Sequence, residues 1–258
     1  MFGWWRRRRR RRILAQPFPT AWEEILRRKV RFYGMLRPDR AERLRKLIQI
    51  FVAEKPFFGA AGLEITDEIR VVVAAAAARL VLHLDLSLYD DLREVVVYPY
   101  EALRHPKRRD DGPFLGEAHS FGTVVLSWPA VEAGLANPCD GHDTATHEFA
   151  HVLDHADGGF DGTPPLRARE HYRAWAEVMA RRFTRLRGGG RAERRVLRMY
   201  GAKNEAEFFA VATEAFFERP ERMRRETPDL YEELRRFFGF APQEDPSCDQ
   251  TDPAADRS

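Results

Sequence analysis

Apolar positions recur with helical spacing over most of the chain. One such stretch runs from Trp22 to Val52 with a break near Pro38, and a second, with an alanine-rich centre, covers residues 67–84. Four more helices are predicted further along: from about Asp143, over 170–187, over 205–218, and in "DLYEELRRFFGF" near the end. This pattern is typical of a mostly helical protein.

Two short segments have instead the β-branched and aromatic composition of strands. They are "EVVVYPYEAL" (94–103) and "FGTVVLSW" (121–128), and the segment between them is predicted to be a loop that carries His119. Glycines and prolines predict further loops over 56–62 and between Trp128 and Asp143. Together with the helices, these strands predict an α+β fold with a small β-sheet.

The two ends of the chain differ in composition from its body. Residues 1–20 are predicted to be a basic arm without regular structure, residues 21–240 a single domain, and residues 241–258 a disordered acidic tail. The pI of about 9.0 depends on the run Arg6–Arg12, because without it 36 basic residues face 40 acidic ones. A nucleic-acid-binding domain should carry its basic patch on the folded body. The run itself, beside Trp4 and Trp5, predicts only an accessory, salt-dependent contact with polyanions.

Three observations favour a cytoplasmic protein. Two cysteines, Cys139 and Cys248, are too few for a disulfide framework, and their scarcity is typical of a reducing compartment. The arginine run is not followed by the apolar stretch and small-residue cleavage site of a signal peptide. The longest apolar run, Val71–Ala78, is far shorter than the roughly 20 residues that cross a bilayer.

The segment "HEFAH", residues 147–151, carries the clearest chemistry. On a helix, His147 and His151 lie one turn apart on the same face and can present two imidazoles to one metal ion. Zinc accepts such ligands and keeps an open position for water, and Glu148 is placed to act on that water as general base. The preceding "DTAT" is typical of a helix start, and the upstream strand suits a zincin-like metallopeptidase domain with an HExxH active-site helix.

Two histidines and a water require a third protein ligand for the expected single zinc ion. His155 continues the same helix face, but positions i and i+8 of a straight helix are about 12 Å apart, so we do not expect it to bind the same ion. Asp154 could instead orient a ligand imidazole. The remaining candidates are glutamates on a second helix: Glu205, Glu207, Glu214 and Glu218.

The combination of "HEFAHVLD" (147–154), "EFFAVATEAFF" (207–217), "VVVYPYEAL" and "GEAHSFGTVVLSW" resembles the Mlc titration factor A family of zinc peptidases over about residues 20–240. The catalytic helices of that family are similar to those of anthrax lethal factor protease. The resemblance implies that Glu207 is the third zinc ligand. Glu214 lies seven residues further on the same helix face, so it is the alternative ligand or a supporting partner. The resemblance also implies that Tyr200 stabilises the oxyanion and that His119 is an additional zinc-binding histidine.

The resemblance further implies a cytoplasmic peptidase that cuts short peptides, of the aminopeptidase type. The alternative is an interaction protein that binds and titrates a transcriptional repressor, with peptidase activity secondary. The intact "HEFAH" motif and Glu207 favour the enzyme, since a binding module has no need of them.

Overall fold

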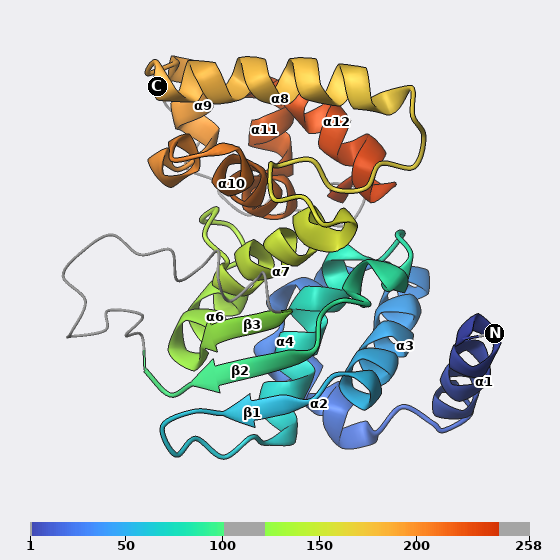
Figure 1. The fold of residues 1–258 in the computed structure, drawn as a ribbon. Coiled ribbons are helices and arrows are strands. Elements are labelled where there is room, and N and C mark those ends of the chain that lie inside the picture. Colours follow the sequence, from blue (N-terminus) through green and yellow to red (C-terminus); the bar gives the residue numbers. More distant parts are fainter. Residues whose placement is uncertain (1, 101–121, 243–258) are drawn as a thin grey trace.

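The computed structural model describes residues 2–100 and 122–242, which form two layers on either side of one central helix (Figure 1). The first layer contains the sheet and the N-terminal helices, and the second contains the C-terminal helices. The predicted α+β fold, mostly helical with a small sheet, is confirmed. His119 lies outside the described residues, as does the predicted tail from residue 243 onward.

The helices of the first layer follow from the apolar pattern. Thr66 accepts a hydrogen bond from the Ile69 N–H and so starts the helix that contains the alanine run. That helix is buried from Val71 to Leu80, because small alanine side chains let its neighbours approach closely. The helices of this layer are α2 (Thr20–Lys29), the 3₁₀ helix η1 (Arg31–Met35), α3 (Pro38–Glu54), α4 (Asp67–Leu80), the 3₁₀ helix η2 (Leu86–Tyr89) and α6 (Trp128–Ala136).

The sheet has three parallel strands: β1 (Phe57–Gly59), β2 (Glu94–Tyr98) and β3 (Thr123–Ser127), with β2 in the centre. Val96 is paired with Phe58 on one side and Val125 on the other, so alternate residues such as Val95 and Val97 are buried against the helices. Gly59 is required where it stands, because a Cβ there would lie 1.8 Å from the carbonyl oxygen of Leu63.

Two elements of this layer were predicted incorrectly as loops. β1 lies within the segment 56–62, and α6 begins directly after β3. α6 starts because the Ser127 side chain accepts the Ala130 N–H and Pro129 occupies its first turn, where its missing N–H costs nothing.

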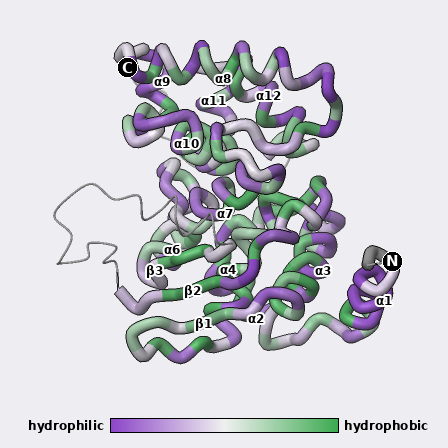
Figure 2. Tube along the Cα trace, viewed as in Figure 1, coloured by the Kyte–Doolittle hydropathy of each residue, from purple (hydrophilic) through white to green (hydrophobic). Residues whose placement is uncertain are grey.

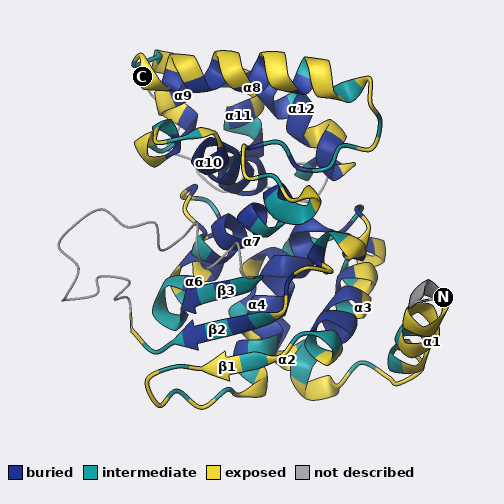
Figure 3. Cartoon of the chain, viewed as in Figure 1, coloured by how far each residue is buried: buried dark blue, intermediate teal, exposed yellow. Residues whose placement is uncertain are grey.

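The C-terminal layer is built around aromatic side chains. Trp175 contacts Phe209 and Phe237, and Phe216 stacks on Phe238 at 5.4 Å. Every residue from Ala206 to Glu218 is buried, so this helix forms the inner face of the layer (Figure 3). The elements of the layer are α8 (His171–Arg187), α9 (Arg191–Val196), η4 (Met199–Ala202), α10 (Glu205–Glu218), α11 (Pro220–Glu226) and α12 (Pro228–Phe238).

α7 (Thr144–Asp154), followed by the short η3 (His155–Asp157), lies between the layers. It packs against α4, α6 and β3 on one side and against α10 on the other. Phe149 points from α7 into the first layer, where its ring contacts Phe51 and Tyr89. The helix that carries the "HEFAH" motif is therefore buried on both sides.

The N-terminal segment differs from the predicted unstructured arm. Residues Phe2–Leu14 form a helix, α1, that packs against α3. The prediction was wrong because it relied on an apolar stripe, which the arginine run lacks. Arginine itself favours helix, and arginines of this run form ion pairs with acidic residues on α3 and beside η2.

Two further expectations concern the compartment. Cys139 lies in the loop before α7. Cys248 lies outside the described residues. Over the part of the chain that the structure describes, no helix combines the length and apolar character needed to cross a bilayer.

Candidate metal centre

The start of α7 places the two histidines. Asp143 caps the helix: its side chain accepts the Thr146 N–H at 3.0 Å and the Thr146 hydroxyl at 2.6 Å. From this fixed start, His147 and His151 follow one turn apart and are both buried. Their Nε2 atoms are 3.2 Å from each other.

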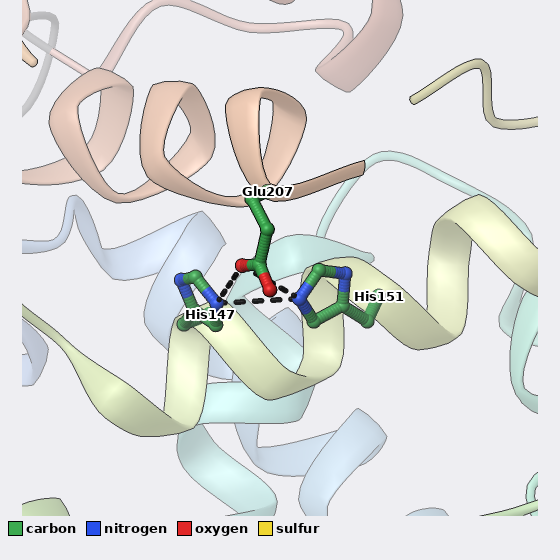
Figure 4. A group of neighbouring side chains, drawn as sticks. All are labelled: His147, His151 and Glu207. Atoms are coloured by element: carbon green, nitrogen blue, oxygen red, sulfur yellow. Dashed lines mark hydrogen bonds and ion pairs between the residues drawn. The ribbon is translucent and has the colours of Figure 1, made fainter. Parts of the chain in front are cut away.

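Glu207 completes a triangle of donor atoms from the opposite layer (Figure 4). Its Oε2 lies 3.0 Å from Nε2 of His147 and 3.4 Å from Nε2 of His151. Atoms bound to zinc at about 2.0–2.1 Å in a tetrahedral arrangement lie about 3.3 Å apart, so the three sides of this triangle have the length that zinc requires. The residues present therefore fit a zinc ion with three protein ligands.

Glu214 supports this group from one side. Its Oε1 accepts the Nδ1–H of His147 at 2.7 Å and a guanidinium N–H of Arg198 at 2.5 Å, and its Oε2 accepts the backbone N–H of Asp143 at 2.8 Å. Because Nδ1 of His147 carries the proton, its Nε2 presents a lone pair to the triangle. Glu214 therefore orients His147 and is not part of the triangle.

The electrostatics of the site favour a cation. Burial alone would lower the pKa of His147, but hydrogen bonds to Glu207 and Glu214 outweigh it and raise the pKa to about 10. Burial alone would likewise raise the pKa of Glu207, and its hydrogen bonds with His147 and His151 instead lower it well below its usual range. The carboxylates of Glu207 and Glu214 therefore favour a cation at this position, either a proton on His147 or a metal ion.

The two residues predicted to be catalytic lie beside the triangle. Glu148 is buried on α7 directly after His147. Tyr200, on η4, donates its hydroxyl to Oε1 of Glu207 at 3.1 Å, and its ring centre is 5.8 Å from that of His147. Burial and the charge of Glu207 raise the pKa of Tyr200, so the phenol keeps its proton and acts as a hydrogen-bond donor.

Asp154 and His155 have other partners. For Asp154, which could have oriented an imidazole, the contact is with the backbone: its Oδ2 accepts the Gly162 N–H at 3.0 Å and fixes the loop after α7. Nδ1 of His155 lies 2.9 Å from the carbonyl oxygen of Gly159, turned toward the same loop.

Three residues at the site were not identified from the sequence. Arg198 pairs with Glu214, and the half-exposed ring of Phe160 lies 5.1 Å from that of His151. The side chain of Lys203 lies 4.0 Å from Glu207 and over the ring of Tyr200. No periodicity in the sequence marks any of the three.

Comparisons with known proteins agree over almost the whole chain. The sequence model of the family described as glucose-regulated metallo-peptidase M90 matches residues 3–239, so the match begins within α1 rather than near residue 20. The uncharacterized protein slr2042 of Synechocystis sp. is 33% identical over 250 residues, 92% of this chain and 90% of the relative. The Mlc titration factor A of Edwardsiella ictaluri is 29% identical over 78% of this chain and 80% of the relative. That of Serratia proteamaculans is 29% identical over 69% and 71%.

Proposed function

Since the chain belongs to the family of glucose-regulated metallo-peptidases M90 and is thus a metallopeptidase, we propose that it uses one zinc ion, held by His147, His151 and Glu207. The observation that carries the proposal is the triangle of donor atoms, with sides of 3.0, 3.2 and 3.4 Å. All three side chains are buried, and Glu214 holds one of them in the required tautomer.

The reaction we propose is peptide-bond hydrolysis. When bound, zinc supplies Lewis-acid chemistry, which acidifies a water molecule and polarises a carbonyl group. Glu148 accepts the proton of the attacking water and delivers it to the leaving amine. Tyr200 donates its hydroxyl hydrogen bond to the oxyanion of the tetrahedral intermediate, in place of the bond it makes to Glu207.

We further propose an aminopeptidase-type preference for short peptides. The support is the resemblance of the site residues to the titration-factor peptidases, together with buried ligands beside the partly exposed rings of Phe160 and Tyr200. Cleavage of aminoacyl p-nitroanilides should therefore exceed cleavage of the same compounds with a blocked amino group. Equal rates on both would contradict the aminopeptidase assignment but not the peptidase.

The test of the reaction is Glu148→Gln. The amide cannot accept the proton of water, so the variant should bind one zinc per chain and lose turnover by at least about 100-fold. Glu205→Gln is the matched control, because Glu205 is an exposed glutamate on α10 two residues before Glu207. It should keep both zinc and activity. Wild-type turnover in Glu148→Gln would show that another group acts as base.

Binding of a transcriptional repressor is the second candidate function. It is favoured by the name of the relatives, Mlc titration factor A, which match up to 84% of this chain. Glu148→Gln separates the two functions, since it should lose turnover and keep any repressor complex. A repressor that binds wild type and this variant equally would show that binding does not depend on the chemistry.

A further inference from the structure

One face of α1 is fixed to the body of the protein. Arg10 makes a bidentate ion pair with Glu54 at 2.8–3.2 Å, and Arg9 donates to the carbonyl oxygen of Ala53 at 2.9 Å. Arg6 pairs with Asp90, and Ile13 packs against the core. These four residues are spaced at i, i+3, i+4 and i+7, which is one face of a helix. The orientation of α1 about its own axis is therefore set.

The opposite face of α1 is exposed. At 3.6 residues per turn, Trp4, Arg8 and Arg11 lie within about 30° of the point directly opposite the fixed face, and Arg7 and Arg12 flank them. Trp5 lies about 90° from the same point, at the side of the helix, and Trp4 and Trp5 are 59% and 63% exposed. We call this set the outer face of α1: Trp4, Trp5, Arg7, Arg8, Arg11 and Arg12.

Location and polarity set this face apart from the rest of the molecule. α1 stands at the edge of the fold beyond α3, away from the metal centre (Figure 1), and its trace is mainly hydrophilic (Figure 2). It is also exposed along most of its length (Figure 3). No acidic residue lies in the segment 2–14, whereas the remainder of the chain has more acidic than basic residues. Positive charge and exposed aromatic surface are thus concentrated on one protruding rod.

We infer that the outer face of α1 binds the surface of a bilayer that contains anionic lipids. A helix lying on such a surface places arginines at the level of the lipid phosphates and tryptophans at the boundary between headgroups and acyl chains. The fixed face already pairs Arg6 and Arg10 with carboxylates, so the arginines of the outer face are left to meet lipid phosphates.

The arrangement of the tryptophans favours a bilayer over a nucleic acid. Base stacking requires an open aromatic face beside a basic groove that follows the phosphate backbone. Here the guanidinium of Arg8 lies over the Trp4 ring at 5.4 Å, and Trp5 packs edge-on against Trp4 at 5.1 Å. The result is an exposed pair of tryptophan rings beside cations, on a chain whose remaining residues carry a net negative charge.

The test uses the full-length protein and sedimentation with vesicles. Vesicles of phosphatidylcholine with about 30% phosphatidylglycerol should bind the protein, and vesicles of phosphatidylcholine alone should bind it much less. Each arginine near an anionic surface strengthens binding about fivefold, so Arg7→Gln, Arg8→Gln, Arg11→Gln and Arg12→Gln together should weaken it by at least about 100-fold. Trp4→Ala with Trp5→Ala should abolish quenching of the tryptophan fluorescence by brominated acyl chains.

The matched control removes four exposed arginines from the C-terminal layer instead: Arg173, Arg185, Arg187 and Arg191, each changed to Gln. It has the same net charge as the α1 variant and should bind vesicles like the wild type. Circular dichroism and zinc content check that every variant is folded, and neither depends on peptidase activity.

Three results would overturn the inference: equal binding to neutral and anionic vesicles, equal loss in the control, or full retention in the α1 variant. A single-stranded oligonucleotide at the same ionic strength provides the competing arm. Tighter binding to the oligonucleotide than to the vesicles would assign the outer face to nucleic acid instead.

Discussion

Replacing Glu214 by Gln tests how the metal centre is held. Glu214 accepts three hydrogen bonds, two on Oε1 from His147 and Arg198 and one on Oε2 from the Asp143 N–H. An amide has one accepting oxygen. If that oxygen faces His147 and Arg198, the NH₂ group meets the N–H of Asp143, which leaves a buried donor unpaired and costs about 1–3 kcal/mol of folding stability.

Zinc affinity should fall as well. The negative charge of Glu214 strengthens the imidazole of His147 as a ligand, and loss of such a supporting carboxylate typically weakens metal binding 10–100-fold, or about 1.4–2.7 kcal/mol. Competition with a chromogenic chelator measures this directly on the folded apo-protein. Thermal unfolding of the same sample measures the stability term separately.

Glu218→Gln is the matched control for this experiment. Glu218 lies one turn further along α10, is also buried, and also accepts a backbone N–H, that of His142 at 2.8 Å. It makes no hydrogen bond to a histidine ring of the triangle. Zinc affinity in Glu218→Gln should therefore match that of the wild type. An equal fall in both variants, or no fall in Glu214→Gln, would refute the orienting role of Glu214.

Three further predictions follow from the same contacts. Glu207→Ala should leave the protein without bound zinc after dialysis, measured by atomic absorption, and full occupancy would move the third ligand elsewhere. Tyr200→Phe should keep zinc and lower kcat about 10–100-fold on a chromogenic peptide, and an unchanged kcat would remove Tyr200 from the mechanism. Burial raises the pKa of Glu218 to about 9, so the folded state holds a proton that the unfolded state releases above its ordinary pKa. Stability should fall by up to about 1.4 kcal/mol per pH unit between about pH 5 and 9, and urea titrations should show a flatter profile for Glu218→Gln.

The sequence predicted those helices whose own side chains supply an apolar face. α4, α7 and α10 are such cases, since each has enough buried apolar residues to be recognised alone. β1 and α1 could not be found in this way. β1 exists because β2 offers partners to a three-residue segment, with Val95 donating to Pro56 and Ala60 to Val97. α1 depends on ion pairs with residues 44 and 84 positions away.

The candidate site likewise contains residues that the sequence alone could predict and residues that depend on tertiary packing. His147 and His151 follow from their spacing on one helix, which requires no knowledge of the rest of the chain. Glu207 was one of four candidate glutamates until the family resemblance selected it, because only tertiary packing brings α10 against α7. Arg198 makes its contact from outside either helix, so no periodicity marks it.

The carboxylates of α10 also determine how the whole molecule loses its structure. Glu207, Glu214 and Glu218 reach from the C-terminal layer to side chains and backbone amides of α7 and the loop before it. Separating the layers would break these hydrogen bonds and expose the buried apolar side chains of α7 and α10 to water, at a cost comparable to the total stability of many domains. The C-terminal helices therefore have no independent melting step, and heating should produce one cooperative transition in which both layers unfold together.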